Sequence, residues 1–151
     1  MTEVKHKDQL LKTYMLFVQV AQAVNKYSDN RLRKSNHLKT ATYLALEGLI
    51  ESGGMMSHTK LAEWANTRKH NITGLVDRMK KQGLVTTEYS TEDKRTVPIR
   101  ITEKGRELFV KASSIHQDII KSVMRGIVGD KAVEIEKLLK VMRSNIEQQS
   151  R

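Results

Sequence analysis

Apolar residues recur every three or four positions through most of the chain, which is the pattern of amphipathic helices. The spacing predicts a first helix over about residues 8–29, followed by the basic run 31–34, and a second helix from about Thr40 to Gly53-Gly54. Ser57 suits the N-cap of a short third helix with Leu61, Ala62 and Trp64. After a polar turn at 65–68, a fourth helix ends at Gly83, with an apolar face made of Ile72, Leu75, Val76 and Met79.

From Leu84 the hydrophobic period shortens from 3.6 residues to two, which predicts a β-hairpin with strands around 85–89 and 97–101. The loop at 90–95 is long and charged and should project into solvent. Pro98 has no N–H, so its strand should lie at a sheet edge, or Pro98 should face away from its partner. Thr102 can cap a long fifth helix reaching Ile127, and a sixth follows the break at Gly129-Asp130.

Two short helices joined by a tight turn and followed by a hairpin describe a winged helix-turn-helix. The predicted fold is mainly α with a small β-hairpin wing. The domains are a winged helix-turn-helix at 37–101 and a helical dimerisation region at 1–36 and 102–151. The sixth helix carries an apolar stripe, and the fifth is apolar over more of its circumference than packing on one side requires. A homodimer would cover these surfaces.

Composition narrows the function. The 151 residues carry a net charge of +10, half of it within residues 57–106, which favours a polyanionic partner, although a basic surface kept for solubility is the alternative. There is no cysteine, so disulfides and thiolate metal sites are excluded. No segment is apolar enough to cross a membrane and no secretory signal is present, so we expect a cytoplasmic, nucleoid-associated protein.

The exposed face of the fourth helix is the candidate for entering the major groove of double-stranded DNA. Asn71 can make a bidentate contact to adenine, and Gly74 would let the helix backbone approach the duplex closely. An ordinary solvated face is the alternative. The candidate DNA-binding residues are Ser57, Thr59, Thr67, Arg68, Lys69, His70, Asn71, Thr73, Gly74, Arg78, Lys81, Lys94 and Arg95.

The loop cations Lys94 and Arg95 lie where a wing tip can reach the neighbouring minor groove, whose negative potential attracts arginine. Asp93 is repelled by phosphate, so its role should be internal. We hypothesise that Asp93 or Asp77 pairs with Arg95 and orients the wing. A flexible charged turn is the competing explanation.

The run from about Leu38 to Leu108 resembles the MarR family (multiple antibiotic resistance regulators) of bacterial transcription factors. The resemblance rests on the order and spacing of short motifs, which are Leu61-Ala62-Glu63, Asn71-Ile72-Thr73, Leu75 to Met79, Gly83-Leu84-Val85, Asp93-Lys94-Arg95 and Ile101 to Gly105. Two departures stand out. Thr86-Thr87 replaces a basic pair common in relatives, so a usual phosphate contact is in doubt, and the missing cysteine excludes the branch of peroxide sensors.

The resemblance implies a homodimer whose first, fifth and sixth helices intertwine and carry two lobes to successive major grooves of a pseudo-palindromic operator. It also implies regulation by a small aromatic or phenolic effector, sometimes anionic, bound between the dimerisation helices and the DNA-binding lobe. Candidate lining residues are Tyr14, Phe17, His37, Tyr43 and Met55, which can equally be plain core residues.

The sequence holds no catalytic motif such as a phosphate-binding loop, a nucleophile elbow or HExxH, so an enzyme is not expected. The five histidines do not show zinc-ligand spacing, and neither a metal nor a cofactor is expected. The favoured function is therefore a sequence-specific transcriptional repressor relieved by a small molecule. The alternatives are a DNA-coating or architectural protein without sequence specificity and, more weakly, a winged helix used for protein contacts.

Overall fold

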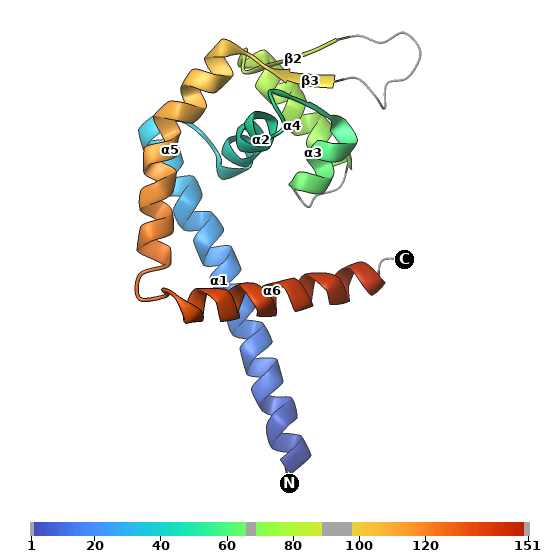
Figure 1. Ribbon diagram of the computed structural model, residues 1–151, viewed down its shortest axis with the longest axis vertical. Helices are drawn as coiled ribbons and strands as arrows, with labels where there is room; N and C mark the ends of the chain where they lie inside the picture. The colour runs from blue at the N-terminus through green and yellow to red at the C-terminus, as the bar shows by residue number, and fades with distance from the viewer. Residues whose placement is uncertain (1, 66–68, 89–97, 150–151) are drawn as a thin grey trace. The chain divides into compact units, whose positions relative to one another are not determined.

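The computed structural model describes residues 2–65, 69–88 and 98–149, with side chains described from residue 8 onward except at 69 and 70. Six helices and three short strands follow one another along this part of the chain (Figure 1). They are α1 Thr2–Asn36, α2 Thr40–Glu51, β1 Met55–Ser57, α3 His58–Trp64, α4 Lys69–Lys81, β2 Val85–Thr87, β3 Pro98–Ile101, α5 Glu103–Val123 and α6 Asp130–Gln149. The chain forms two compact units, residues 1–117 and 118–151.

The core of the first unit is built by α2, α3, α4 and the strands. Leu46 and Leu49 of α2, Leu61 of α3 and Met79 of α4 are fully buried together with Ile99 of β3. These are the apolar positions that the helical and strand periods predict. The mainly α fold with a winged helix-turn-helix is confirmed.

The three strands form one antiparallel sheet in the order β1-β3-β2. Met56 pairs with Ile99, and Thr86 pairs with Arg100. The predicted hairpin strands are present, but the third strand, β1, was not predicted, because its three residues are too few for a recognisable period. Its presence makes β3 the central strand, so the first of the two alternatives predicted for Pro98, a strand at the sheet edge, is wrong.

Pro98 is tolerated because of its place within β3. It is the first residue of the strand, and the pairing with β2 ends one residue later, at Thr87 opposite Ile99. The N–H groups of Ile101 and Thr102 donate in opposite directions, to Gly54 and Leu84. By this alternation the nitrogen of Pro98 lies on the β2 side, beyond the paired residues, and no ladder hydrogen bond is lost.

The ends of the helices differ from the prediction in three places. The first helix begins at Thr2 instead of near Asp8. The first helix continues to Asn36 instead of ending near Asp29, so the basic run 31–34 lies in its last turns. A chain reversal at His37, whose φ is 53°, ends it. The fifth helix ends at Val123, which leaves Met124 and Ile127 in the turn that follows.

Two predicted helix caps are confirmed. Ser57 Oγ accepts a hydrogen bond from the N–H of Lys60 at 3.2 Å. Thr102 Oγ1 accepts from the N–H of Gly105 at 3.1 Å and donates to the carbonyl of Gly83 at 2.7 Å. The Thr102 hydroxyl therefore fixes the start of α5 against the end of α4.

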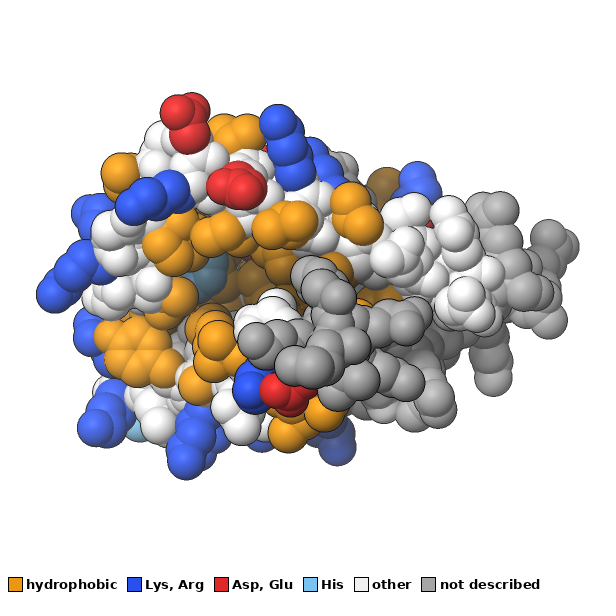
Figure 2. Space-filling view, turned by 90° about the horizontal axis from the view of Figure 1, so that it is seen from below, with side chains coloured by type: hydrophobic (Ala, Val, Ile, Leu, Met, Phe, Trp, Pro, Cys, Tyr) orange, Lys and Arg blue, Asp and Glu red, His pale blue; other side chains and the backbone are white. Residues whose placement is uncertain are grey.

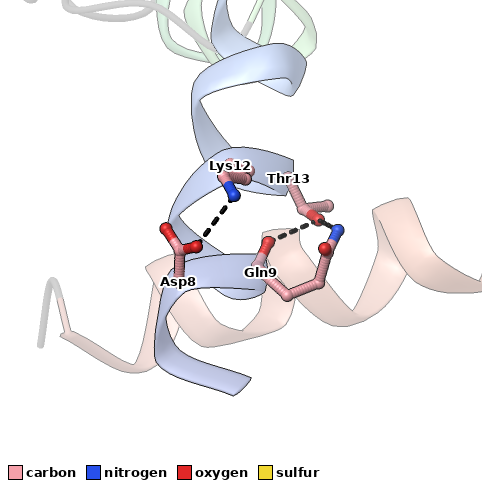
Figure 3. Close-up of polar contacts among 4 residues, drawn as sticks. All are labelled: Asp8, Gln9, Lys12 and Thr13. Atoms are coloured by element: carbon pink, nitrogen blue, oxygen red, sulfur yellow. Dashed lines mark hydrogen bonds and ion pairs between the residues drawn. The ribbon is translucent and has the colours of Figure 1, made fainter. Parts of the chain in front are cut away.

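The longer helices leave many apolar side chains in water. On the N-terminal half of α1, Leu10 is 72% exposed. Polar side chains of the same segment pair with one another along the helix, as Lys12 does with Asp8 (Figure 3). Leu138 on α6 is 58% exposed. Figure 2 shows a face on which hydrophobic side chains gather among Lys and Arg. Large apolar patches that a chain leaves exposed mark surfaces that contact another molecule.

Gly105 tests the packing of α5 against the sheet. An alanine Cβ there would collide with the carbonyl oxygen of Leu84 and lie 2.9 Å from Ile101 Cγ1. We expect Gly105→Ala to lower the free energy of unfolding by about 1–3 kcal/mol, measured by urea denaturation.

The matched control is Gly74→Ala, because the nearest atom to a Cβ at Gly74 is Arg78 Nη1 at 3.5 Å, an ordinary contact. Because alanine has a higher helix propensity than glycine and no atom obstructs its Cβ here, this change should stabilise the fold by up to about 1 kcal/mol. Equal effects of the two substitutions would contradict the packing described here.

Candidate nucleic-acid interface

Helix α4 has one buried and one exposed face. Ile72, Leu75, Val76 and Met79 are all buried in the core, as their spacing predicts. The exposed side chains of the described part are Asn71, Thr73, Asp77, Arg78 and Lys81, and Gly74 is half-buried. The core thus fixes which residues this helix presents to a partner.

The exposed face has a centre and two flanks. At about 100° per residue, Gly74, Asp77 and Lys81 lie opposite the buried stripe. Asn71 and Arg78 lie together on one flank, and Thr73 lies on the other. A Cβ on Gly74 would be 3.5 Å from Arg78 Nη1, so the guanidinium extends back along the helix and lies beside Gly74.

The junction of β1 and α3 supplies two further candidates, Ser57 and Thr59. Ser57 is half-buried and its hydroxyl already accepts the capping bond from Lys60, whereas Thr59, the second residue of α3, is exposed. The position of α3 against α2 is fixed by Trp64, whose indole Nε1 donates to the carbonyl of Leu44 at 3.2 Å. The indole ring lies where a Cβ on Gly48 would be 2.8 Å away, so only glycine fits at 48.

Several predicted site residues fall outside the described residues. These are Thr67 and Arg68 in the turn before α4, and Asp93, Lys94 and Arg95 in the predicted wing. Lys69 and His70 lie in the first turn of α4, but their side chains are not described. The hypothesis that Asp77 or Asp93 orients Arg95 stays a prediction.

A hollow of about 400 Å³ adjoins the Asn71 and Arg78 flank of α4. Its walls come from α1, the α1–α2 turn, α2, the end of α3 and α4. The lining residues are Asn25, Asp29, Lys39, Thr40, Ala41, Leu44, Ala65, Asn71, Ile72, Leu75 and Arg78. The hollow therefore joins the end of the long first helix to the exposed face of α4.

One hydrogen bond in the wall of this hollow connects α1 to α2. Asp29 Oδ1 accepts from the backbone N–H of Thr40 at 2.8 Å, which satisfies one of the free N–H groups at the start of α2. Burial raises the pKa of the Asp29 carboxyl, but the hydrogen bond from the backbone N–H of Thr40 and the charges of Arg33 and Lys39 outweigh burial and leave the pKa below its usual range. The carboxylate is thus charged at neutral pH.

Tyr43, a candidate effector residue, is a core residue of the first unit. It is 2% exposed and stacks on Phe109 with ring centroids 5.1 Å apart, and its centroid lies 4.3 Å from that of His116. Burial, together with the negative charge of Glu47, raises the pKa of Tyr43 to about 12. These ring contacts join α2 to α5.

The structure does not gather the other four effector candidates at the hollow. Tyr14 and Phe17 are exposed on α1, and His37 is exposed in the turn after α1. Met55 lies in β1 beside a separate hollow of about 250 Å³ that is also lined by Met56 and Lys60. None of the five candidates lines the hollow beside α4.

Sequence reasoning missed Asp29, Lys39 and the hollow. The only signal for the Asp29 contact in the sequence is a carboxylate eleven residues before the first residue of α2. Asp29 becomes a neighbour of Thr40 only because the chain turns at His37. Within the described residues, no group of three or more His, Asp or Glu side chains could hold a metal ion. No helix there has the length and hydropathy needed to span a bilayer.

Comparisons with known proteins agree with this geometry. A family model described as MarR family matches residues 39–97. The chain is 27% identical over 142 residues to the HTH-type transcriptional repressor IacR of Pseudomonas putida, covering 93% of this chain and 84% of the relative.

Two solved structures are similar over most of the chain. The organohalide-sensing regulator RdhR-CbdbA1625 with bound 2,4-dichlorophenol has a TM-score of 0.78 and 27% identity, covering 91% of this chain and 80% of that one. The regulator Sco3205 from Streptomyces coelicolor, solved with DNA, has a TM-score of 0.79 and 22% identity, covering 95% and 91%, and this likeness concerns the fold alone.

The contact between Asp29 and Thr40 gives a pH-dependent prediction. At neutral pH, Asp29→Ala should lower the free energy of unfolding by about 1 kcal/mol, the usual cost of losing a helix-capping side chain. Since the folded pKa is depressed, the carboxylate stabilises the fold fully above the unfolded pKa, near 4, and this stabilisation is lost as pH falls through the folded pKa.

The difference between the native protein and Asp29→Ala should therefore shrink between about pH 5 and about pH 2 in urea denaturation. Asp29→Asn, which keeps an oxygen acceptor without the charge, should have an intermediate effect at neutral pH. A difference that does not change with pH would contradict a role for the charged carboxylate.

Proposed function

We propose that this winged helix-turn-helix chain is a transcriptional regulator of the MarR family, and that it acts as a homodimeric, sequence-specific repressor relieved by a small molecule. Members of this family regulate transcription and are not enzymes. The observation that carries the proposal is that α4 buries one apolar side in the core and exposes the opposite, polar side.

Helix α4 reads base edges in the major groove in this proposal. Asn71 is the specificity residue, because its amide can donate to and accept from one adenine. Gly74 allows close approach of the helix backbone, and Arg78 and Lys81 neutralise phosphate charge. Lys94 and Arg95 extend the contact to the adjacent minor groove.

The outer helical regions, 1–36 and 102–151, join two copies of the winged helix-turn-helix at 37–101. Support comes from the apolar side chains exposed on α1, α5 and α6, such as Leu10 and Leu138, which a second copy would bury. Two-fold symmetry then places the two α4 helices in successive major grooves, about 34–36 Å apart, over a pseudo-palindromic operator.

Repression and its relief are supported by similar proteins. IacR is described as a transcriptional repressor, and RdhR-CbdbA1625 is described as organohalide-sensing with bound 2,4-dichlorophenol. Occupation of an operator blocks promoter access, and an effector that weakens DNA binding restores it. A coupling of about 1–3 kcal/mol changes operator affinity some 5–150-fold, which suffices for regulation.

Asn71→Ala tests sequence reading. We expect a loss of about 1–3 kcal/mol on the operator found by genome-wide footprinting and little loss on random DNA, both measured by fluorescence anisotropy. Lys94→Ala, which removes a phosphate contact, should weaken both complexes alike. Equal losses on the two DNAs for Asn71→Ala would instead favour a DNA-coating protein without sequence specificity.

Sedimentation equilibrium tests the dimer. At about micromolar concentration the protein should sediment at twice its 17.3 kDa chain mass. Leu138→Glu places a charge in the exposed apolar stripe of α6 and should shift the protein toward monomer. Lys137→Glu, at the neighbouring exposed position, is the matched control and should remain dimeric, whereas a native monomer refutes this assembly.

A further inference from the structure

The face of the sheet that points away from the core carries an arginine. Ile99 and Ile101 of β3 are buried, so Arg100 between them points to the opposite, exposed face. Its cross-strand neighbours are Thr86 on β2 and Met55 on β1, and both are uncharged and exposed. The guanidinium of Arg100 therefore stands in the middle of this row with no cation beside it on either strand.

We propose that Arg100 contacts a DNA phosphate at the base of the wing, and that its ion pair with Glu88 opposes this contact. Glu88 lowers the affinity for DNA because it holds the guanidinium that the phosphate needs. Neither residue is among the DNA-binding candidates that the sequence pattern indicates. The inference rests on the proposed function, since it assigns this pair to the same DNA interface.

The place of Arg100 along the chain puts it between two proposed DNA contacts. Arg100 follows Arg95 of the predicted wing by five residues, and its partner Thr86 follows Lys81 of α4 by five residues. Five residues span at most about 18 Å. A chain that places α4 in a major groove and Arg95 in the adjacent minor groove must cross the phosphate strand that separates the grooves. Strands β2 and β3, which lie side by side, form this crossing segment (Figure 1).

The ion pair between Arg100 and Glu88 is weak enough to open. Arg100 Nη2 donates to Glu88 Oε1 at 3.3 Å, which is longer than the 2.7–2.9 Å usual for a charge-assisted hydrogen bond. The two side chains are 52% and 65% exposed, and water screens exposed pairs of this kind. A phosphate can therefore replace Glu88 as the partner of the guanidinium, because arginine binds phosphate through two parallel hydrogen bonds.

The charge of Glu88 gives the pair its effect on affinity. Its carboxylate occupies Arg100 in the free protein and repels a phosphate that approaches the same face. Phosphate contacts supply most of the affinity that does not depend on sequence. The pair thus sets the strength of DNA binding, and the base-reading side chains of α4 set which sequence is bound.

The salt dependence of binding to a random duplex tests the phosphate contact. Arg100→Gln should flatten the slope of log K against log salt concentration by about one unit per chain, because one phosphate contact fewer releases counterions. Arg100→Lys should keep the native slope, since a lysine ammonium also neutralises a phosphate. An unchanged slope for Arg100→Gln, or equally flattened slopes for both variants, overturns the contact.

The matched control is Lys140→Gln. Lys140 is also an exposed cation paired with a carboxylate, that of Glu136, but the pair lies on α6, outside the winged helix-turn-helix. The substitution changes the net charge by the same amount and should leave the slope at its native value. A slope as flat as that of Arg100→Gln would show a general charge effect and overturn the contact. Circular dichroism and sedimentation verify that both variants fold and assemble like the native protein.

Glu88→Gln tests the opposing role of the ion pair. It should tighten binding to the random duplex by up to about fivefold per chain, the range that exposed ion pairs contribute, whereas Glu136→Gln on α6 should have no effect. In the Arg100→Gln background the gain should be smaller, because only the direct repulsion of phosphate is then removed. Weaker binding of Glu88→Gln, or equal gains in both backgrounds, overturns the opposing role.

These measurements separate the inference from the proposed function. Native protein that binds no duplex at low salt refutes both. Native binding with an unchanged salt slope for Arg100→Gln refutes the inference alone. Because the duplex is random, a lack of operator preference refutes the sequence-specific repressor without changing the result for Arg100 and Glu88.

Discussion

The burial of one stripe of α4 is the constraint on which the rest of the structure depends. Ile72, Val76 and Met79 are almost fully enclosed by residues of α2, α3 and the sheet. Rotating α4 about its axis would expose these side chains and bury charged ones, at a cost of several kcal/mol. The polar face is therefore fixed in direction by packing, before any partner is present.

The joint between α1 and α2 links the long first helix to the part of the chain that contains α4. His37 holds a left-handed backbone conformation, and Asp29 bonds to the first turn of α2 across the same turn. Both features connect the end of α1 to the helices that position α4. The hollow opens beside this joint and is also lined by Asn71 and Arg78 of α4.

Local physics explains why much of the fold could be predicted from the sequence. The caps at Ser57 and Thr102, the stop at Gly83 and the two faces of α4 all depend on residues within a few positions of one another. The resemblance to the MarR family rests on the same local motifs, and the match at residues 39–97 agrees with it.

The features that escaped prediction depend on distant parts of the chain. Strand β1 exists because Met56 finds Ile99 as its partner, and this pairing turns the strand of Pro98 into a central one. The hollow assembles residues from Asn25 to Arg78, and the ring stack of Tyr43 needs Phe109 and His116. The continuation of α1 to Asn36 places the basic run in a helix, where the pattern alone had predicted a helix end near Asp29.

The central claim is that two copies of the chain place their α4 helices in successive major grooves of one duplex. Hydroxyl-radical footprinting tests this claim most directly, because it reports which parts of the sugar backbone the bound protein protects. The account predicts two protected regions related by a two-fold axis, with centres one helical turn of about 10–10.5 base pairs apart. A single asymmetric region, or uniform protection along the duplex, would contradict it.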